Sequence, residues 1–377
     1  MTGKFIPGCG NPNAKIMFIG ESPDEASEKI GLPFVGSSGE IFNSMLREAN
    51  IDRGRVWLTN IFKHRLPNND FNKCELIGQT LNQALDILWV EINSISPNII
   101  VALGGKVLTA LTGKKTITNW RGSILSSTRG YPKVIPTYHP AHLLYSMETE
   151  SDREISGYWQ KYIITFDFKR AVAQSEFKEF RLPQRILHFA HNSSEVYDFL
   201  QRNRDKRMLS LDIETMRSIP VCIALAFTRY EAMSIPLLDT INGVKLCNIP
   251  PHDLAYCWNM IDQTLNDSRY LKIGQNFKFD QERLERICKI TIDKLYGDTM
   301  LLGHILHPEL PKSQAFFTSL YTEEPYYKDE GKEFNIKKDK IDRFYNYNAK
   351  DAAVALEIFE EMIKVYTEDF IEKEVST

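Results

Sequence analysis

The stretch Leu209-Ser-Leu-Asp-Ile-Glu-Thr215 places two acidic residues, Asp212 and Glu214, inside an apolar strand pattern. Side chains on a strand alternate between its two faces. Asp212 and Glu214 are therefore predicted to point the same way, while Leu211 and Ile213 enter the core. Taken alone, two carboxylates on one face of a strand are more often a solvated face than a chemical site, so the rest of the chain decides their role.

Two later segments add further acidic residues to this pair, Asp280 and Asp351. These segments are Gln275-Asn-Phe-Lys-Phe-Asp280 and Tyr347-Asn-Ala-Lys-Asp351. On a helix, Asn276 would share a face with Asp280, and Tyr347 with Asp351. Four carboxylates in one place repel each other and raise their own pKa values unless cations lie between them. The pattern predicts two-metal phosphodiester hydrolysis, with oxygen ligands that favour Mg²⁺ or Mn²⁺ over zinc.

At these residues the chain resembles the proofreading 3′→5′ exonuclease domain of family A DNA polymerases, the DEDDy group, from about Arg185 to the C-terminus. The resemblance implies a ribonuclease H-like α/β fold. It also implies that Asp212, Glu214 and Asp351 bind a first metal ion, and that Asp212 and Asp280 bind a second. Tyr347 would orient the attacking water, and Asn276 would be a polar partner beside the site. Asp298, just before an apolar helical run, is expected to be an N-cap and not a ligand.

The composition is that of an ordinary globular protein with two domains. The 377 residues exceed what one core usually organises, with 43% hydrophobic and 25% charged residues. Neither a membrane span nor a signal peptide is expected, since there is no run of about 18 apolar residues and no charged-then-apolar leader. The six cysteines form no close pair, which indicates reduced thiols. A net charge of −3 means that DNA binding must depend on local patches and metal ions.

The domain boundary is expected in the charged stretch 176–185, between a domain at 1–175 and another at 186–377. The first domain alternates apolar strands with helical stretches. The strands are expected at Lys15–Gly20, Val56–Thr59, Asn98–Leu103 and Lys133–Pro136, and the helices at Gly39–Ala49, Leu76–Ile95 and Gly105–Leu111. This alternation predicts a three-layer α/β domain with a parallel sheet, where ligands bind at the carboxyl ends of the strands.

Polar and aromatic residues follow those strand ends. They lie in Gly20-Glu-Ser-Pro23, Gly31-Leu-Pro-Phe-Val-Gly36, Asn60 and Pro136-Thr-Tyr-His-Pro-Ala-His-Leu-Leu144. Taken singly, such segments are more often core, turn or capped loop. In this order they resemble the uracil-DNA glycosylase superfamily, closest to its family 4 members, over roughly residues 5–172.

Cleaving an N-glycosidic bond requires a flipped base, a stabiliser for the departing uracil anion and a path for water to the sugar. By the resemblance, Phe34 would stack on the base, Asn60 would read its pairing edge, and His139 would hydrogen-bond the uracil O2. Glu21, Ser22 and Pro23 would line the water side. Leu143 or Leu144 would insert into the base stack.

The chain also departs from the family 4 pattern. Asp24 replaces a glycine, and Tyr145 replaces an arginine. The family's iron–sulfur cluster needs four thiolates. Cys9 alone lies near the expected N-terminal pair, while His64 and Ala84 stand where cysteines are usual, so no iron–sulfur cluster is expected.

Both domain types also occur together in the N-terminal part of some bacteriophage DNA polymerases. The exonucleases of these phage polymerases resemble this chain at two further segments, Pro308-Glu-Leu-Pro-Lys-Ser313 and Glu324-Pro-Tyr-Tyr-Lys-Asp329. No polymerase palm motif follows, so a DNA polymerase is expected on a separate chain or in a missing C-terminal part. The expected substrate is DNA with single-stranded or frayed 3′ ends, in the cytoplasm of a bacterial or phage-infected cell. Phe277 and Phe279 could stack on its bases or belong to the core.

Three hypotheses remain open. The chain could be an exonuclease whose first domain excises uracil, or an exonuclease whose first domain binds DNA or a modified base without cleaving it. It could also be a non-catalytic accessory protein of a polymerase.

Overall fold

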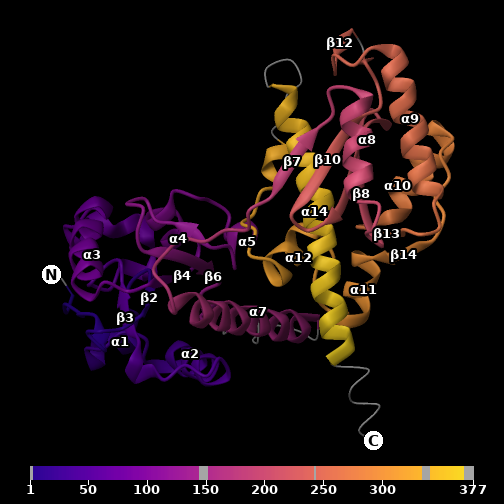
Figure 1. The fold of residues 1–377 in the computed structure, drawn as a ribbon. Helices are drawn as coiled ribbons and strands as arrows, with labels where there is room; N and C mark the ends of the chain where they lie inside the picture. The colour runs from indigo at the N-terminus through magenta and orange to yellow at the C-terminus, as the bar shows by residue number, and fades with distance from the viewer. Residues whose placement is uncertain (1–2, 144–151, 242, 333–339, 369–377) are drawn as a thin grey trace, which may run out of the picture. The chain divides into compact units, whose positions relative to one another are not determined.

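The computed structural model describes residues 3–143, 152–241, 243–332 and 340–368. The chain divides into two compact units, Met1–Arg181 and Leu182–Thr377 (Figure 1). Each unit is built on its own six-stranded sheet. Among the described residues, no helix is both long and apolar enough to cross a membrane.

The sheet of the first unit has the strand order β1-β3-β2-β4-β6-β5. Its central strands β3, β2, β4 and β6 are parallel, and the edge strands β1 and β5 pair antiparallel to their neighbours. The bounds are β1 Cys9–Gly10, β2 Ile16–Gly20, β3 Trp57–Asn60, β4 Ile99–Leu103, β5 Leu125–Ser126 and β6 Lys133–Thr137. The parallel sheet expected from the sequence is confirmed.

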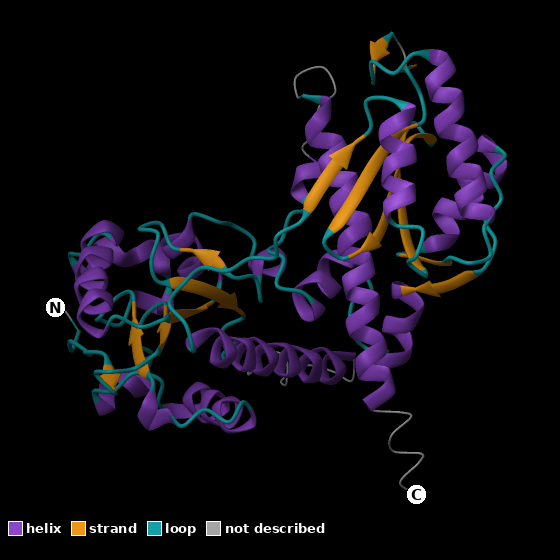
Figure 2. Ribbon diagram, in the orientation of Figure 1, coloured by secondary structure: helices purple, strands orange, loops and turns teal. Residues whose placement is uncertain are grey.

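Helices cover both faces of this sheet (Figure 2). Met17 and Ile19 of β2 pack toward α3 (Leu81–Ile95) and α4 (Gly105–Thr112), while Phe18 between them packs toward α2 (Gly36–Glu48) and α7 (Asp152–Ser175). Successive side chains of a strand point to opposite faces, so a fully apolar strand covered on both sides produces three layers. Two further short helices of this unit are α1 Glu25–Ile30 and α5 Ile117–Trp120.

The stretch 76–95, predicted as one helix, contains a break. Residues Phe71–Ile77 form 3₁₀ turns that end at Gly78, whose φ is 75°. Helix α3 then begins at Leu81, because Thr80 and Gln83 form a reciprocal capping box at its N-terminus. The glycine and the capping threonine define a new helix start that apolar periodicity alone does not show.

The sheet of the second unit has the order β14-β13-β8-β9-β10-β7. Strands β8, β9 and β10 form an antiparallel meander, β13 and β14 extend it parallel to β8, and β7 is parallel to β10. The bounds are β7 Ile186–Phe189, β8 Met208–Met216, β9 Ile219–Thr228, β10 Glu231–Pro236, β13 Leu271–Gly274 and β14 Leu295–Asp298, with a separate hairpin of β11 Thr240–Ile241 and β12 Val244–Lys245. This is the ribonuclease H-like α/β arrangement that was expected.

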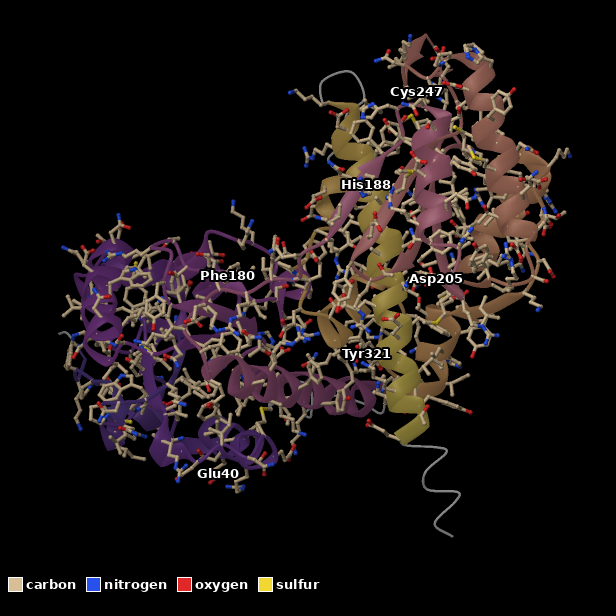
Figure 3. All side chains as sticks on the ribbon, viewed as in Figure 1. Glu40, Phe180, His188, Asp205, Cys247 and Tyr321 are labelled. Carbon is tan, nitrogen blue, oxygen red and sulfur yellow. The ribbon has the colours of Figure 1, made fainter. Side chains whose placement is uncertain are left out.

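Helix α14 (Ile341–Tyr366) covers one face of this sheet, and α8 (Ser193–Arg202) and α9 (Pro251–Asn266) cover the other. Small side chains on β9, Ala224 and Ala226, meet a run of alanines on α14. This contact lets α14 approach the sheet closely. Further α-helices of this unit are α10 Phe277–Arg283, α11 Thr299–Leu306, α12 Gln314–Tyr321 and α13 Asp329–Lys332. Tyr321 marks the end of α12 in Figure 3.

Candidate active sites

Strand β8 presents its two acidic residues to helix α14. Leu211 and Ile213 belong to the core on the α8–α9 side, so Asp212 and Glu214 project from the opposite face. One carboxylate oxygen each from Asp212, Glu214 and Asp351 lie within 4.8 Å of one another. The structure thus brings together three of the four predicted metal ligands, from β8 and α14.

Asp280, the fourth predicted ligand, lies outside that group of three but beside it. Its Oδ1 accepts a hydrogen bond from the backbone N–H of Ile213 at 3.0 Å, which ties α10 to β8. Burial raises the pKa of Asp280 to about 7, and the charge of Asp280 contributes to raising the pKa of Asp212. Asp280 therefore acts electrostatically on the same site.

The pKa values of the cluster are raised, as expected for crowded carboxylates. Burial, reinforced by the charge of Asp351, raises the pKa of Glu214 to about 8. Burial and then the charges of Asp351, Glu214 and Asp280 raise the pKa of Asp212 well above its usual range. Such a site favours extra protons or bound cations at neutral pH. The hard carboxylate donors fit a divalent ion such as Mg²⁺ or Mn²⁺.

Tyr347 lies on α14 one turn before Asp351 and is buried to 9% exposure. Burial and the charges of Asp351, Glu214 and Asp212 raise the pKa of its phenol. The phenol therefore keeps its proton across the physiological range and can donate a hydrogen bond.

Asn276 differs from its predicted place inside a helix. It is the N-cap of α10 with φ 54°, and its side chain is exposed, whereas Asp280 is buried. The reason is Asp298, whose carboxylate accepts hydrogen bonds from the amides of Asn276 (2.9 Å), Phe277 (2.8 Å) and Met300 (2.8 Å). The prediction that Asp298 is an N-cap is confirmed.

Sequence reasoning missed three residues that contact the carboxylates. The Asn348 amide donates to Oδ2 of Asp212 at 2.8 Å, and Tyr327 donates its hydroxyl to Oδ1 of Asp351 at 2.6 Å. The ammonium of Lys328 lies 2.6 Å from the same oxygen. A buried asparagine in an alanine-rich helix was a usable signal for Asn348, and Tyr327 and Lys328 lie in the segment Glu324-Pro-Tyr-Tyr-Lys-Asp329, whose resemblance to phage polymerases gave them no specific role.

In the first unit, the carboxyl ends of β2, β3 and β6 surround a cavity of about 550 Å³. Its lining includes five of the predicted site residues, Glu21, Ser22, Phe34, Asn60 and His139. Strand ends of a parallel sheet meet at one edge, which explains why residues far apart in the sequence converge there.

Phe34 and Asn60 approach the backbone at Gly20. A Cβ at Gly20 would overlap Oδ1 of Asn60 and lie 2.9 Å from Cζ of Phe34. The Phe34 ring stacks on Phe42 with centroids 5.0 Å apart and is only 8% exposed. The ring and the amide are thus held in fixed positions at the cavity, as recognition of a flat polar base requires.

His139 is held in one tautomer. The backbone N–H of Ala141 donates to its Nδ1 at 3.1 Å, so the proton of the neutral ring resides on Nε2. Burial lowers the pKa of His139 to about 4, with a smaller contribution from His142. At neutral pH the ring is an uncharged hydrogen-bond donor.

Glu21 lies at the N-terminal end of α4, where its carboxylate accepts a hydrogen bond from the backbone of Lys106. Burial raises the pKa of Glu21, and the charge of Lys106 partly offsets this rise. A carboxylate at a helix N-terminus is stabilised by the helix dipole. Glu21 is therefore suited to hold a water molecule at the cavity as a hydrogen-bond acceptor.

A buried polar network holds the backbone of Asn60 in place. The Lys63 ammonium donates to the backbone carbonyl of Asn60 at 2.9 Å and pairs with Glu91 and Thr59. Glu91 also accepts a hydrogen bond from the Trp57 indole at 2.7 Å. This network fixes the end of β3.

Comparison with known proteins identifies both units. The family model "Uracil DNA glycosylase superfamily" matches residues 7–162. The type-4 uracil-DNA glycosylase of Thermotoga maritima is 40% identical over 152 residues, covering 39% of this chain and 76% of that protein. The chain belongs to the uracil-DNA glycosylase superfamily. The corresponding enzyme of Archaeoglobus fulgidus is 32% identical and is covered to 77%.

The second unit is a 3′-5′ exonuclease domain of the family A DNA polymerase kind, whose family model matches residues 187–366. A DNA polymerase of Bacillus phage SP01 is 26% identical over 331 residues, covering 80% of this chain but 34% of that protein. The match to the phage polymerase therefore extends across both units of the chain.

Some residues of the glycosylase unit do not lie where the sequence predicted them. Leu143 is fully buried in the core and does not line the cavity, so its insertion into the base stack stays a prediction. Leu144 and Tyr145 lie outside the described residues. Pro23 is buried and is not part of the cavity lining. Asp24 caps α1 through the Ser27 amide at 2.8 Å and accepts a hydrogen bond from Ser38 at 3.3 Å.

The residues present do not fit a four-thiolate iron–sulfur cluster. Ala84 is fully buried in the core and offers no ligand atom, and Nδ1 of His64 contacts the carbonyl oxygen of Gly3 at 2.7 Å. Cys9 and Cys74 are free and half-buried.

Proposed function

We propose that the chain is a DNA-processing enzyme with two active sites. Residues 186–377 form a metal-dependent 3′→5′ exonuclease, residues 1–175 form a glycosylase that excises uracil, and residues 176–185 link them. The observation that carries the first activity is the grouping of Asp212, Glu214 and Asp351 within 4.8 Å, with Tyr347 one turn away.

Asp212, Glu214 and Asp351 would hold one divalent ion, and Asp212 with Asp280 a second. When bound, paired ions stabilise the attacking and leaving oxygens of phosphodiester hydrolysis. The neutral Tyr347 phenol orients the attacking water by a hydrogen bond. Asn348 keeps Asp212 in place, and the Ile213 amide does the same for Asp280.

The substrate would be a single-stranded or frayed 3′ end. Phe277 is buried in the core, but the Phe279 ring, one residue before Asp280, is 37% exposed. The Arg283 guanidinium lies 3.3 Å from the Phe279 ring centroid. An exposed ring with a cation beside the carboxylates supports stacking on a terminal base. Asn276, also exposed at the start of α10, would contact the same strand end.

The exonuclease is tested with a 5′-labelled single strand in Mg²⁺. We expect stepwise release of mononucleotides that Asp212→Ala abolishes. Asp205→Ala is the matched control, because Asp205 is exposed and pairs only with the neighbouring Lys206 in the described ion pairs (Figure 3). Full cleavage by the Asp212→Ala protein would contradict the metal assignment.

In the glycosylase, Phe34 would stack on the flipped uracil and Asn60 would read its pairing edge. Nε2–H of His139 would donate to O2 as negative charge develops on the leaving base. Glu21 would orient the water, with Ser22 lining the same side. The fixed tautomer of His139 and its low pKa support this assignment.

Uracil excision is tested with a strand that contains one internal uracil. The protein is incubated in EDTA to silence the exonuclease, and the strand is then treated with hot alkali. A break at the uracil supports excision. An intact strand that still binds the protein would favour the second candidate, a domain that recognises uracil or a modified base without cutting it.

The similarity to a phage DNA polymerase supports action beside a polymerase in the cytoplasm of a bacterial or phage-infected cell. The polymerase would reside on another chain or on the same polypeptide. Co-purification of DNA synthesis activity with the chain from its native source would test this proposal, and synthesis that never accompanies it would contradict it.

A further inference from the structure

Residues 322–328, which connect α12 to α13, place two side chains beside a predicted metal ligand. Tyr327 donates its hydroxyl to Oδ1 of Asp351 at 2.6 Å, and Nζ of Lys328 lies 2.6 Å from the same oxygen. A neutral donor and a cation therefore share one carboxylate oxygen. Neither residue is a predicted metal ligand or the tyrosine that orients the attacking water.

The ammonium of Lys328 is held in place by groups other than the carboxylate. It donates to Oε1 of Gln314 at 2.9 Å, and Nε2 of Gln314 donates to the backbone carbonyl of Asp351 at 2.8 Å. The ammonium also lies 5.4 Å from the ring centroids of both Tyr327 and Tyr347. Its side chain is 16% exposed. Lys328 is thus built into the site and is not a surface lysine that happens to reach it.

The charges at the site explain what such a lysine would do. Asp212, Glu214, Asp280 and Asp351 place up to four negative charges close together, and one ammonium relieves part of their repulsion. A divalent ion bound by Asp351 would lie close to this ammonium, and the two cations would repel each other. The phosphate of a nucleotide brings negative charge and can attract the ammonium away from Asp351.

We propose that Lys328 is a displaceable counter-cation that makes tight metal binding depend on a nucleotide phosphate. It is a positioning residue that acts through Asp351. Without DNA, Lys328 holds Asp351 and weakens metal binding. With a 3′-terminal nucleotide present, Lys328 transfers to a phosphate oxygen and the carboxylate becomes available to the ion. The inference rests on the proposed exonuclease site.

The test measures Mn²⁺ binding to the full chain at pH 8, by the electron paramagnetic resonance signal of free Mn²⁺, with and without thymidine 5′-monophosphate. For the natural chain we expect affinity to rise about tenfold when the nucleotide is added. Lys328→Met should bind Mn²⁺ about tenfold more tightly without nucleotide, because a charge repulsion is removed, and should respond to nucleotide less than about threefold.

Two variants separate charge from hydrogen bonding. Tyr327→Phe removes the neutral donor to the same Asp351 oxygen and should leave Mn²⁺ affinity within about threefold of the natural value, since no charge changes. Lys328→Arg keeps the charge and should retain the response to nucleotide. Equal tightening by Tyr327→Phe and Lys328→Met would overturn the counter-cation role.

Asp212→Ala distinguishes a failure of the proposed exonuclease site from a failure of the proposed role of Lys328. If the natural chain binds no Mn²⁺ that Asp212→Ala removes, the proposed exonuclease site fails, and this inference fails with it. If Asp212→Ala removes the binding but Lys328→Met leaves it unchanged, only the role of Lys328 is overturned. Should Lys328→Met not fold, the natural chain still decides, because an Mn²⁺ affinity unaffected by the nucleotide contradicts the proposal.

Discussion

The side-chain amide of Asn348 donates a hydrogen bond to Oδ2 of Asp212 at 2.8 Å, while its own Oδ1 accepts one from Ser234 at 2.6 Å. The same amide lies 3.1 Å from the backbone carbonyl of Asp212. One buried residue on α14 therefore fixes the carboxylate at the centre of the site to strands β8 and β10.

We expect Asn348→Ala to lower the exonuclease rate about 10- to 100-fold, the usual cost of losing a group that orients a metal ligand. The measurement is single-turnover cleavage of a 5′-labelled strand in Mg²⁺, with thermal unfolding followed in parallel. Ser234→Ala removes only the anchor of Asn348 on β10 and keeps the hydrogen bond from Asn348 to Asp212, so a smaller loss of rate is expected. An Asn348→Ala protein that cleaves at the natural rate would contradict the orienting role of Asn348.

The metal-free protein should lose stability as pH rises from about 4 to 8. Glu214 and Asp280 have pKa values raised to about 8 and about 7 by burial, so the folded state binds more protons than the unfolded chain in this interval. The stabilisation is complete below the unfolded pKa and is lost as pH passes through the folded values. We expect the unfolding temperature of the exonuclease unit in EDTA to fall by roughly 5 °C or more.

Glu214→Gln removes one of these titrations and should flatten the pH dependence of unfolding in EDTA. Saturating Mn²⁺ should have the same effect on the natural chain, because a bound ion replaces the protons. An unfolding temperature that stays constant over this pH range in EDTA would contradict the raised pKa values.

His139→Ala should lower uracil excision about 10²- to 10³-fold, as loss of one oxyanion donor typically does. Since burial lowers the pKa of His139 to about 4, the ring stays neutral from pH 6 to 8. We therefore expect that the excision rate of the natural protein shows no inflection near pH 6.5 caused by titration of His139. Abasic-site formation in EDTA as a function of pH measures both effects.

The fold and the positions of the acidic residues could be predicted because both follow from regular patterns of apolar residues in the sequence. Period-two alternation alone places Asp212 and Glu214 on the face opposite Leu211 and Ile213, and the register of β8 against β9 confirms it. In the first unit, the strand pattern predicted the sheet edge where Glu21 and Asn60 meet. These inferences need no knowledge of distant contacts.

The remaining site residues depend on contacts that no local pattern encodes. Lys328 forms an ion pair with Asp351 from an irregular segment. Asn276 lies at the N-cap of α10 and not inside the helix, because the carboxylate of Asp298 accepts a hydrogen bond from its backbone amide. For Leu143, the turn in which the His142 amide bonds to the His139 carbonyl directs the side chain inward. Adjacent leucines in a sequence do not reveal which one faces the core.

Gly20 provides a test of close packing in the glycosylase cavity. A methyl group at this position would overlap Oδ1 of Asn60 and crowd the Phe34 ring. Gly20→Ala should therefore displace both base-contacting side chains. We expect at least a tenfold loss of uracil excision, since misplacement of a recognition group by about 1 Å costs up to 10²-fold.

Gly105→Ala is the matched control for Gly20→Ala. A Cβ at Gly105 would lie 3.8 Å from Cβ of Ile117, an ordinary contact, and alanine is favoured over glycine in α4. Excision and stability should therefore stay near the natural values in Gly105→Ala. A Gly20→Ala protein that excised uracil at the natural rate would contradict the proposed recognition of the base by Asn60 and Phe34. Neither side chain can keep its position beside the added methyl group.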